Sequence, residues 1–284
     1  MQQLDNIKAL RTLLISWRQA GDRIAFVPTM GDLHAGHLSL VREARKGAER
    51  VVVSIFVNPL QFGENEDFDH YPRGLDSDSE KLKFAGVDLL FSPTVSELYP
   101  NGQQSVTQVL VPVIGDTLCG ASRPGHFSGV ATVVSKLLNI VQPDNTLFGE
   151  KDFQQLLIIK KLAADLCFPS DIIGVPTCRE ADGLAMSSRN RYLSDTEREL
   201  APALIRELRN AKELIESNPS ADFSQLTQQA ANTLNNAGFI TDYFEIRRAT
   251  DLAKPNRDDR DLVVIAAAGL GKARLIDNLR VNAE

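Results

Sequence analysis

Short apolar runs that alternate with helical patterns are the feature that most constrains the fold of this chain. Apolar runs bounded by turn residues predict strands at residues 23–30, 50–59, 86–93, 106–112, 145–149 and 171–177. Helical spacing of apolar residues predicts helices at residues 7–17, 36–48, 129–142 and 151–166. Apolar strands separated by helices are typical of a parallel sheet covered by helices on both faces. The first part of the chain is therefore predicted to be an α/β domain.

The pattern changes after about residue 177. Two amphipathic helices are predicted at residues 195–217 and 223–238, and two longer strand-like runs follow at 240–249 and 261–279. Helices followed by strands indicate a separate, smaller α+β domain. We place the boundary near Pro176, which predicts domains at residues 1–176 and 177–284.

Composition excludes several classes of function. The 284 residues include 31 basic and 37 acidic side chains, with a net charge of −6. The sequence shows neither the basic excess nor the basic stripe of a nucleic-acid binder. No apolar stretch is long enough to span a bilayer, no signal-peptide pattern is visible, and the three cysteines lack metal-type spacing. We expect a cytoplasmic protein that binds neither nucleic acid nor membrane.

The sharpest motif is PTMGDLHAGHLSLV, residues 28–41. It leads from a predicted strand into a predicted helix, which is where ligands bind in open α/β sheets. Gly31 and Gly36 allow the backbone to approach a ligand, and the helix N-terminus offers N–H groups to a phosphate. His34 and His37 lie one helical turn apart and can point the same way. The alternatives are two surface histidines beside an ordinary turn, or a metal pair that lacks a nearby third ligand.

A second motif, MSSRNRYL at residues 186–193, follows the last strand of the predicted α/β domain. Ser187 and Ser188 provide two hydroxyls, and Arg189 provides a planar cation with five donors, which together match phosphate oxygens. A serine cluster that caps a helix beside a solvated arginine is the alternative.

A third motif, FGEKDFQQL at residues 148–156, places Lys151 in the first turn of a predicted helix. A lysine is slightly unfavourable at the positive end of a helix dipole, unless an anion lies between them. A surface lysine offset by Glu150 and Asp152 explains this segment equally well. Gln61 and Gln155 are amides suited to the hydroxyl and carboxylate groups of a small substrate.

Two of these motifs together resemble a known superfamily. HxGH near the first strand and Met-Ser-Ser-Arg after the last strand resemble the signatures of the HIGH/KMSKS nucleotidyl-transferases, which bind ATP and break the bond between its α- and β-phosphates. More closely, PTMGDLHAGHLSLV, FVNPLQF, LCGASRPGHFSGVATVV, FGEKDFQQL and GLAMSSRNRYLS resemble blocks of the pantothenate synthetase family, in the family's order. They cover most of residues 26–194, and the C-terminal third matches only in its general pattern.

The resemblance implies an ATP-dependent condensation of pantoate with β-alanine. It implies Mg²⁺ as a cofactor, a pantoyl-adenylate intermediate, and release of AMP and pyrophosphate. It also implies a cytoplasmic homodimer with a Rossmann-like N-terminal domain and a smaller C-terminal lid. Asp76 or Asp78 would then hold the magnesium, although solvated surface acids are the simpler interpretation of that segment.

The family's roles transfer to matching positions of this sequence. ATP would contact Met30, Gly31, Asp32, Leu33, His34, Ala35, Gly36 and His37, then Gly149, Glu150, Lys151 and Asp152, and finally Met186, Ser187, Ser188 and Arg189. The catalytic set would be His37, His34, Lys151, Ser187, Ser188 and Arg189. Gln61 and Gln155 would bind pantoate, and Gln61 would also neighbour the β-alanine site.

Two other functions stay open at this point. One is another HxGH nucleotidylyltransferase, which would transfer AMP or CMP onto a phosphate and would need a cationic site for that phosphate. The other is a nucleotide-binding regulatory module without turnover, which has no need of both glutamines and the full phosphate set. A Walker A site is excluded, because GLGK at residues 269–272 lacks the upstream glycine and the Ser or Thr.

Overall fold

The computed structural model of this chain describes residues 1–63, 68–218, 221–256 and 258–282. The chain forms two compact units, Met1–Glu150 with Ile158–Pro176, and Lys151–Leu157 with Thr177–Glu284. The expected first domain, residues 1–176, included Lys151–Leu157, whereas the structure groups this segment with the second unit.

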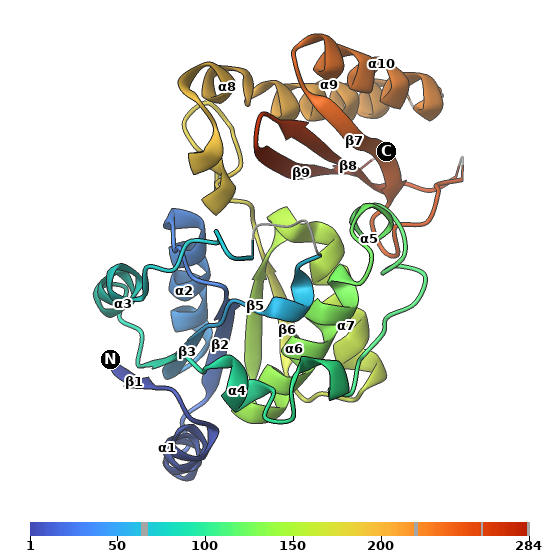
Figure 1. Ribbon diagram of the computed structural model, residues 1–284. Coiled ribbons are helices and arrows are strands. Elements are labelled where there is room, and N and C mark those ends of the chain that lie inside the picture. The colour runs from blue at the N-terminus through green and yellow to red at the C-terminus, as the bar shows by residue number, and fades with distance from the viewer. Residues whose placement is uncertain (64–67, 219–220, 257, 283–284) are drawn as a thin grey trace. The chain divides into compact units, whose positions relative to one another are not determined.

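A parallel sheet forms the centre of the first unit (Figure 1). Among the described residues it has six strands in the order β1-β4-β3-β2-β5-β6, and every neighbouring pair is parallel. The strands are β1 (Gln2–Leu4), β2 (Ile24–Thr29), β3 (Arg50–Ile55), β4 (Leu89–Phe91), β5 (Asn145–Gly149) and β6 (Asp171–Val175). The predicted parallel α/β sheet is confirmed.

Helices cover the sheet of the first unit. Helices α2 (Ala35–Gly47) and α3 (Leu75–Phe84) pack apolar side chains onto one face, against alternate residues of β2 and β3. Helix α6 (His126–Val141) contacts β2 and has α1 (Ile7–Gln19) beside it. The remaining elements of the connections are α4 (Val95–Leu98), α5 (Cys119–Ser122), η1 (Pro59–Gln61), η2 (Gln103–Ser105), η3 (Glu150–Asp152) and α7 (Phe153–Asp165).

The strand order contains one topological switch point, between β2 and β5. From β2 the chain moves outward through β3 to β4, and from β5 it moves in the opposite direction to β6. Ligands of open α/β sheets bind at the carboxyl ends of the strands that flank such a point. The loop after β2, which begins at Met30, and the segment after β5, which begins at Glu150, are therefore the expected location of a site.

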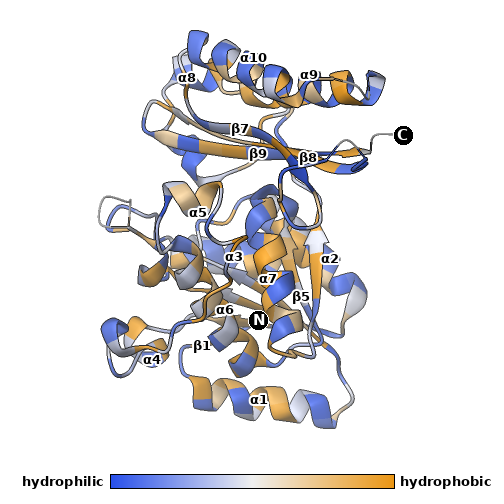
Figure 2. Cartoon of the chain, turned by 90° about the vertical axis from the view of Figure 1, so that its right-hand side faces the viewer, coloured by the Kyte–Doolittle hydropathy of each residue, from blue (hydrophilic) through white to orange (hydrophobic). Residues whose placement is uncertain are grey.

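The second unit is a three-stranded antiparallel sheet with two helices on one face. The strands are β7 (Ile240–Arg248), β8 (Asp261–Leu270) and β9 (Ala273–Asn282), and the helices are α9 (Ala203–Ser217) and α10 (Phe223–Asn236). Figure 2 shows hydrophobic and hydrophilic residues alternating along α9 and α10. Their buried residues, including Leu208 and Leu234, form one core with alternate residues of β8. The predicted α+β architecture of this part is confirmed.

Three predicted elements differ in the structure. Residues 106–112 form no strand, because β1 already occupies the outer edge of β4 and the Val109 N–H donates to Thr132 Oγ1 of α6 at 3.0 Å. The run 261–279 is a hairpin of β8 and β9, with Gly271 at φ 55° in the turn. The predicted helix 195–217 divides into α8 (Asp195–Leu200) and α9, because Pro202 lacks the N–H that a continuous helix needs.

The described helices include none that is both long enough and apolar enough to cross a membrane.

Leu208 tests the core of the second unit. Its side chain is fully buried on α9, so we expect Leu208→Ala to lower the free energy of unfolding by about 2–5 kcal/mol, through lost burial and a residual cavity. Leu214 lies on the same helix and is 48% exposed, so Leu214→Ala is the matched control. Urea titrations of the two variants should differ clearly in midpoint; equal midpoints would contradict this core.

Candidate active site

The turn after β2 is held by a buried acid from α3. Asp78 is 2% exposed, and its Oδ2 accepts from Asp32 N at 2.7 Å while its Oδ1 accepts from Leu33 N at 2.9 Å. The Lys81 ammonium donates to Leu33 O at 2.8 Å and lies 3.4 Å from Asp78 Oδ1. Asp32 has φ 50°, a left-handed conformation that needs such outside support. Asp78 is therefore a clamp on the turn.

The burial of Asp78 corrects one of the two expectations for this residue. The carboxylate is not a solvated surface acid, because it is almost fully buried. A magnesium ion at Asp78 stays a prediction, since each carboxylate oxygen keeps a second lone pair beside the N–H group that it accepts. Asp76, two residues earlier, is exposed in the first turn of α3.

Gly31 is needed for this clamp. Its φ of 85° is rarely adopted by other residues. A Cβ at this position would lie 3.1 Å from Ile55 Cγ2 and 3.2 Å from Asp78 Oδ2. Thr29 supports the turn from the other side, since its hydroxyl donates to Ser54 O at 2.8 Å and accepts from Gly31 N at 3.2 Å.

The two histidines of the motif cap helix α2. His34 is the N-cap, and its Nδ1 accepts from Gly36 N at 3.2 Å, while His37 Nδ1 accepts from His34 N at 3.3 Å. The ring centroids are 4.1 Å apart, with the planes tilted by 45°. Because each Nδ1 accepts a hydrogen bond, the proton of each neutral ring lies on Nε2. The caps therefore select the tautomer in which both Nε2–H groups are donors.

These donors stand at a helix terminus that favours anions. The first N–H groups of α2 and its positive dipole end add to the two imidazole donors. The helix also follows β2 at the switch point of the sheet. Donors arranged in this way are suited to phosphate oxygens.

Gln61 is positioned by a buried polar network. It closes the short turn η1 and is 8% exposed. Asn58 is fully buried at the start of this turn; its Nδ2 donates to Gly129 O at 3.1 Å, and its Oδ1 accepts from the Tyr99 hydroxyl at 2.8 Å. Burial raises the pKa of the Tyr99 phenol far above its usual range, which keeps it a protonated donor. Sequence analysis did not assign a role to Asn58 or Tyr99.

Helix α6 approaches this turn unusually closely. A Cβ at Gly129 would lie 2.0 Å from Leu60 O and 2.8 Å from Gln61 N, so only glycine fits there. The His126 ring lies with Nδ1 2.8 Å from Gln61 O, and its Nε2 lies 3.0 Å from Arg123 Nη1. The block LCGASRPGHFSGVATVV signalled this segment in the sequence, but it carried no residue assignment.

A cavity of about 260 Å³ opens where β2, β3 and β4 end. It is lined by Met30, Gly31, Ile55, Phe56, Val57, Pro72, Arg73, Gly74, Leu75, Asp78, Ser92, Pro93, Thr94 and Val95. Met30 and Gly31 of the expected site line it, whereas Gln61 does not.

Among the other predicted residues, Gly149 and Glu150 belong to the first unit, and Ser187 and Gln155 belong to the second. Ser187 caps the 3-10 turn η4 (Ser188–Tyr192), where its Oγ accepts from Arg189 N at 3.3 Å. Capping and phosphate binding are thus not exclusive interpretations of this serine cluster. Gln155 lies in α7 and is partly buried.

Lys151 lies in η3, next to Glu150 and Asp152 in the sequence. Within the described ranges, its Nζ has neither an ion-pair nor a hydrogen-bond partner. The surface-lysine interpretation required the two neighbouring acids to offset its charge. An anion-binding role for Lys151 stays a prediction.

A parallel sheet with an anion-binding helix N-terminus at its switch point defines a nucleotide-binding type of α/β protein. The family model described as pantoate-beta-alanine ligase matches residues 2–280. Pantothenate synthetases from Shewanella sp. (strain MR-7) and Pseudomonas aeruginosa (strain PAO1) are each 55% identical to this chain, with 97% and 99% of both chains covered, respectively. The chain therefore belongs to the pantoate–beta-alanine ligase family, and it is a ligase.

Solved structures agree with this assignment. Pantothenate synthetase from Thermus thermophilus is 44% identical, covers 99% of this chain and all of its own, and superposes with a TM-score of 0.92. Pantoate-beta-alanine ligase from Francisella tularensis, complexed with beta-gamma ATP and beta-alanine, is 38% identical, with coverage of 99% and 97% and a TM-score of 0.83.

Asp78 provides a test of the clamp. In Asp78→Asn, one acceptor oxygen becomes an NH₂ that cannot accept from the backbone, so we expect a loss of about 1–3 kcal/mol in unfolding free energy. Ligase turnover should fall about tenfold or more, because a loosened turn shifts the two histidines that cap α2. Glu80→Gln is the matched control on the same helix, because Glu80 is exposed and pairs with Lys83. Thermal melts and steady-state rates compare the two variants. Equal stability and turnover of the two variants would show that Asp78 does not hold the turn.

Proposed function

We propose that this chain condenses pantoate with β-alanine, using ATP and passing through a pantoyl adenylate. The observation that carries the proposal is the capping of α2 by the Nδ1 atoms of His34 and His37, from which we infer Nε2–H donors at the N-terminus of the helix. Membership of the ligase family supports the substrates. The Francisella relative, in complex with beta-gamma ATP and beta-alanine, supports two of them in particular.

In the proposed reaction, a pantoate carboxylate oxygen attacks the α-phosphate of ATP in line, and pyrophosphate leaves. A carboxylate is a poor electrophile, and adenylation supplies AMP as its leaving group. Such a step depends mainly on positioning and charge stabilisation. We assign these tasks to residues of both units: His34 and His37 in the first, and Lys151, Ser187, Ser188 and Arg189 in the second.

The wider ATP contacts follow the same division. Met30–His37 and Gly149–Glu150 belong to the first unit, and Lys151–Asp152 and Met186–Arg189 to the second. Gln61 and Gln155 are proposed to bind the polar groups of pantoate, with Gln61 also beside β-alanine. The buried network of Asn58 and Tyr99 supports this role, because it holds the turn that ends at Gln61.

Mg²⁺ is proposed to accompany ATP rather than to occupy a site built from protein side chains. Among the described residues, no group of three or more His, Cys, Asp or Glu side chains could hold a metal ion. Both oxygens of Asp78 accept backbone N–H groups of the turn, so its main task is structural. Magnesium commonly binds through substrate phosphates with few protein ligands.

In the second step, the β-alanine amine attacks the acyl carbon and AMP departs. No strong general base is assigned, so the amine is taken to arrive deprotonated. We further propose a cytoplasmic homodimer, as the family resemblance implies. A nucleotidylyltransferase would instead retain the nucleotide in its product, so product analysis separates the two functions.

The phosphate set is tested by His37→Ala and Lys151→Ala. Each removes a preorganised donor where charge develops, so turnover should fall roughly 10²-fold or more. Neither position is in the core, so circular dichroism should stay normal. The exposed residues His70 and Lys46 provide matched controls as His70→Ala and Lys46→Ala. Near-normal turnover in a folded variant would remove that residue from the catalytic set.

The reaction class is tested by oxygen labelling. If the α-phosphate is attacked, one carboxylate oxygen of pantoate bridges to phosphorus and leaves with AMP. Pantoate labelled with heavy oxygen in its carboxylate should therefore yield AMP with one labelled oxygen, and unlabelled pyrophosphate, by mass spectrometry. Label in inorganic phosphate together with ADP would show attack at the γ-phosphate and overturn the adenylate.

A further inference from the structure

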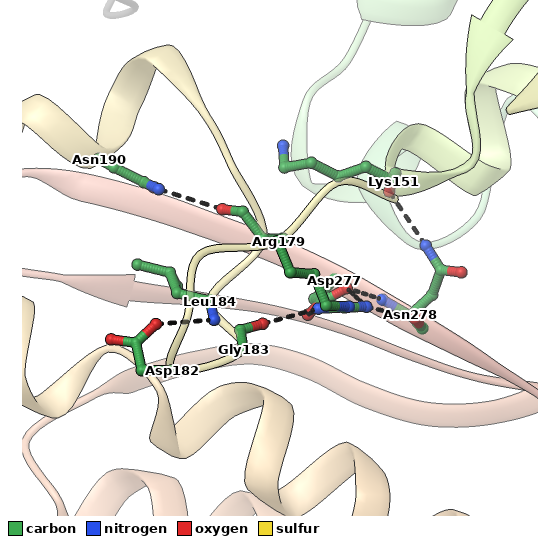
Figure 3. A network of polar contacts seen from close by, with 9 residues as sticks. Lys151, Arg179, Asp182, Gly183, Leu184, Asn190, Asp277 and Asn278 are labelled. Carbon is green, nitrogen blue, oxygen red and sulfur yellow. Dashed lines mark hydrogen bonds and ion pairs between the residues drawn. The ribbon is translucent and has the colours of Figure 1, made fainter. Parts of the chain in front are cut away.

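Strand β9 contacts both phosphate-binding segments of the second unit. Lys151 and residues 187–189 lie far apart in sequence. Figure 3 shows that Asn278 contacts the backbone of Lys151, and that the adjacent Asp277 pairs with Arg179, which precedes residues 187–189 in the chain. The two residues are adjacent on β9 and therefore point to opposite faces of the sheet. Neither belongs to the sequence motifs described above.

Asn278 holds the backbone of Lys151. Its Nδ2 donates to Lys151 O at 3.0 Å, and its side chain is 6% exposed. Two residues along the strand and on the same face, the Arg280 guanidinium lies 5.7 Å from the centre of the Phe153 ring. The Lys151 side chain extends away from this anchor (Figure 3). The anchor thus holds the peptide and leaves the ammonium available.

Asp277 holds the segment that leads to Ser187. It is 3% exposed and pairs with both Nη atoms of Arg179, at 2.6 and 2.9 Å. Arg179 Nη1 also donates to Gly183 O at 3.1 Å. A β-bridge from Arg179 to Ala185 and a bond from Met186 N to Cys178 O at 3.0 Å fold residues 178–186 back on themselves. These contacts fix the position of residue 186, which directly precedes Ser187.

The two anchors are connected. Asn278 N donates to Asp277 Oδ1 at 2.8 Å, and Arg179 Nη2 lies 3.5 Å from Asn278 O. Lys151, Ser187 and Asp277 also line one small cavity. A bidentate arginine–carboxylate pair has strict geometry. A shift of either segment therefore disturbs the contacts of the other.

We propose that Asp277 and Asn278 are positioning residues for ATP, which keep Lys151 and the Ser187–Arg189 segment in register on one strand. This inference rests on the proposed function, because it takes the phosphates of ATP to be the shared ligand. The two residues act through Lys151 and Arg179. They need not contact ATP themselves.

Asn278→Leu is the first test, because leucine has a similar volume without the amide donor. We expect the Kd for ATP to rise about fivefold, in the range of couplings between contacting residues. The KM for β-alanine should stay unchanged. Asn278→Gln, which keeps a donor, should restore part of the affinity. If Asn278 were only structural, Asn278→Leu would lower the melting temperature and the active fraction, but the Kd for ATP would equal that of the wild type. That result would overturn the proposal.

Asp277→Asn separates positioning from charge. Removing a negative charge beside the phosphate set should tighten ATP binding if charge alone mattered, whereas loss of the anchor should weaken it. Asp242→Asn is the matched control, since it breaks the ion pair to Arg274 of β9 but contacts neither phosphate-binding segment. Tighter binding by Asp277→Asn, or equal weakening by the control, would contradict the proposal.

A double-mutant cycle shows whether Asn278 acts through Lys151. In a Lys151→Ala background, Asn278→Leu should change the Kd for ATP by less than about twofold, because the side chain it positions is gone. An undiminished effect there would overturn the proposal. Wild-type product analysis keeps the two hypotheses apart. If the wild type forms no pantothenate, the proposed function is rejected. If the wild type is active and Asn278→Leu has an unchanged Kd for ATP, only the positioning role is rejected.

Discussion

Backbone N–H groups at the end of β2 are the constraint on which the site depends. A turn that leaves a parallel strand and enters a helix presents several such groups without helical partners. In this chain Asp78 accepts from Asp32 and Leu33, while His34 and His37 accept from Gly36 and His34. The acceptors that hold the turn and cap the helix are therefore the oxygens of Asp78 and the Nδ1 atoms of the two histidines. The Nε2–H groups of both rings consequently become donors at the helix terminus.

In the second unit, strand β9 holds two segments that have little regular structure. The two segments of this unit that we propose to bind phosphate, η3 and η4, are short 3-10 turns with little regular structure. Strands β8 and β9 pair in a continuous antiparallel register, and their residues alternate between two faces. Adjacent residues Asp277 and Asn278 can therefore hold one segment each. Rigid elements generally position functional groups more accurately than loops do.

Much of the fold could be predicted because its patterns are local. Apolar runs such as RVVVSI predict β3, and helical spacing predicts α2 and α10. The prediction was wrong where pairing partners decide the outcome. Residues 106–112 have a strand-like composition, yet no sheet edge is open to them beside β4. The run 261–279 is apolar over most of its length, so only the turn at Gly271 reveals two strands.

The sequence by itself determined the family, the α/β class and the chemical types of the site residues, because motifs such as HxGH and MSSR depend on residue identity and spacing along the chain. Tertiary structure alone decided what Asp78, Asn58 and Asp277 do. Each is a polar residue whose burial the local sequence does not reveal, and each is buried against partners that are distant in sequence. Asp78 lies beneath Asp32 and Leu33, Asn58 between Gly129 and Tyr99, and Asp277 against Arg179, by contacts with separations of 46, 45, 71, 41 and 98 residues. Burial turns such groups into anchors, since a buried polar atom must be paired, and burial is a property of the folded chain that no local pattern contains.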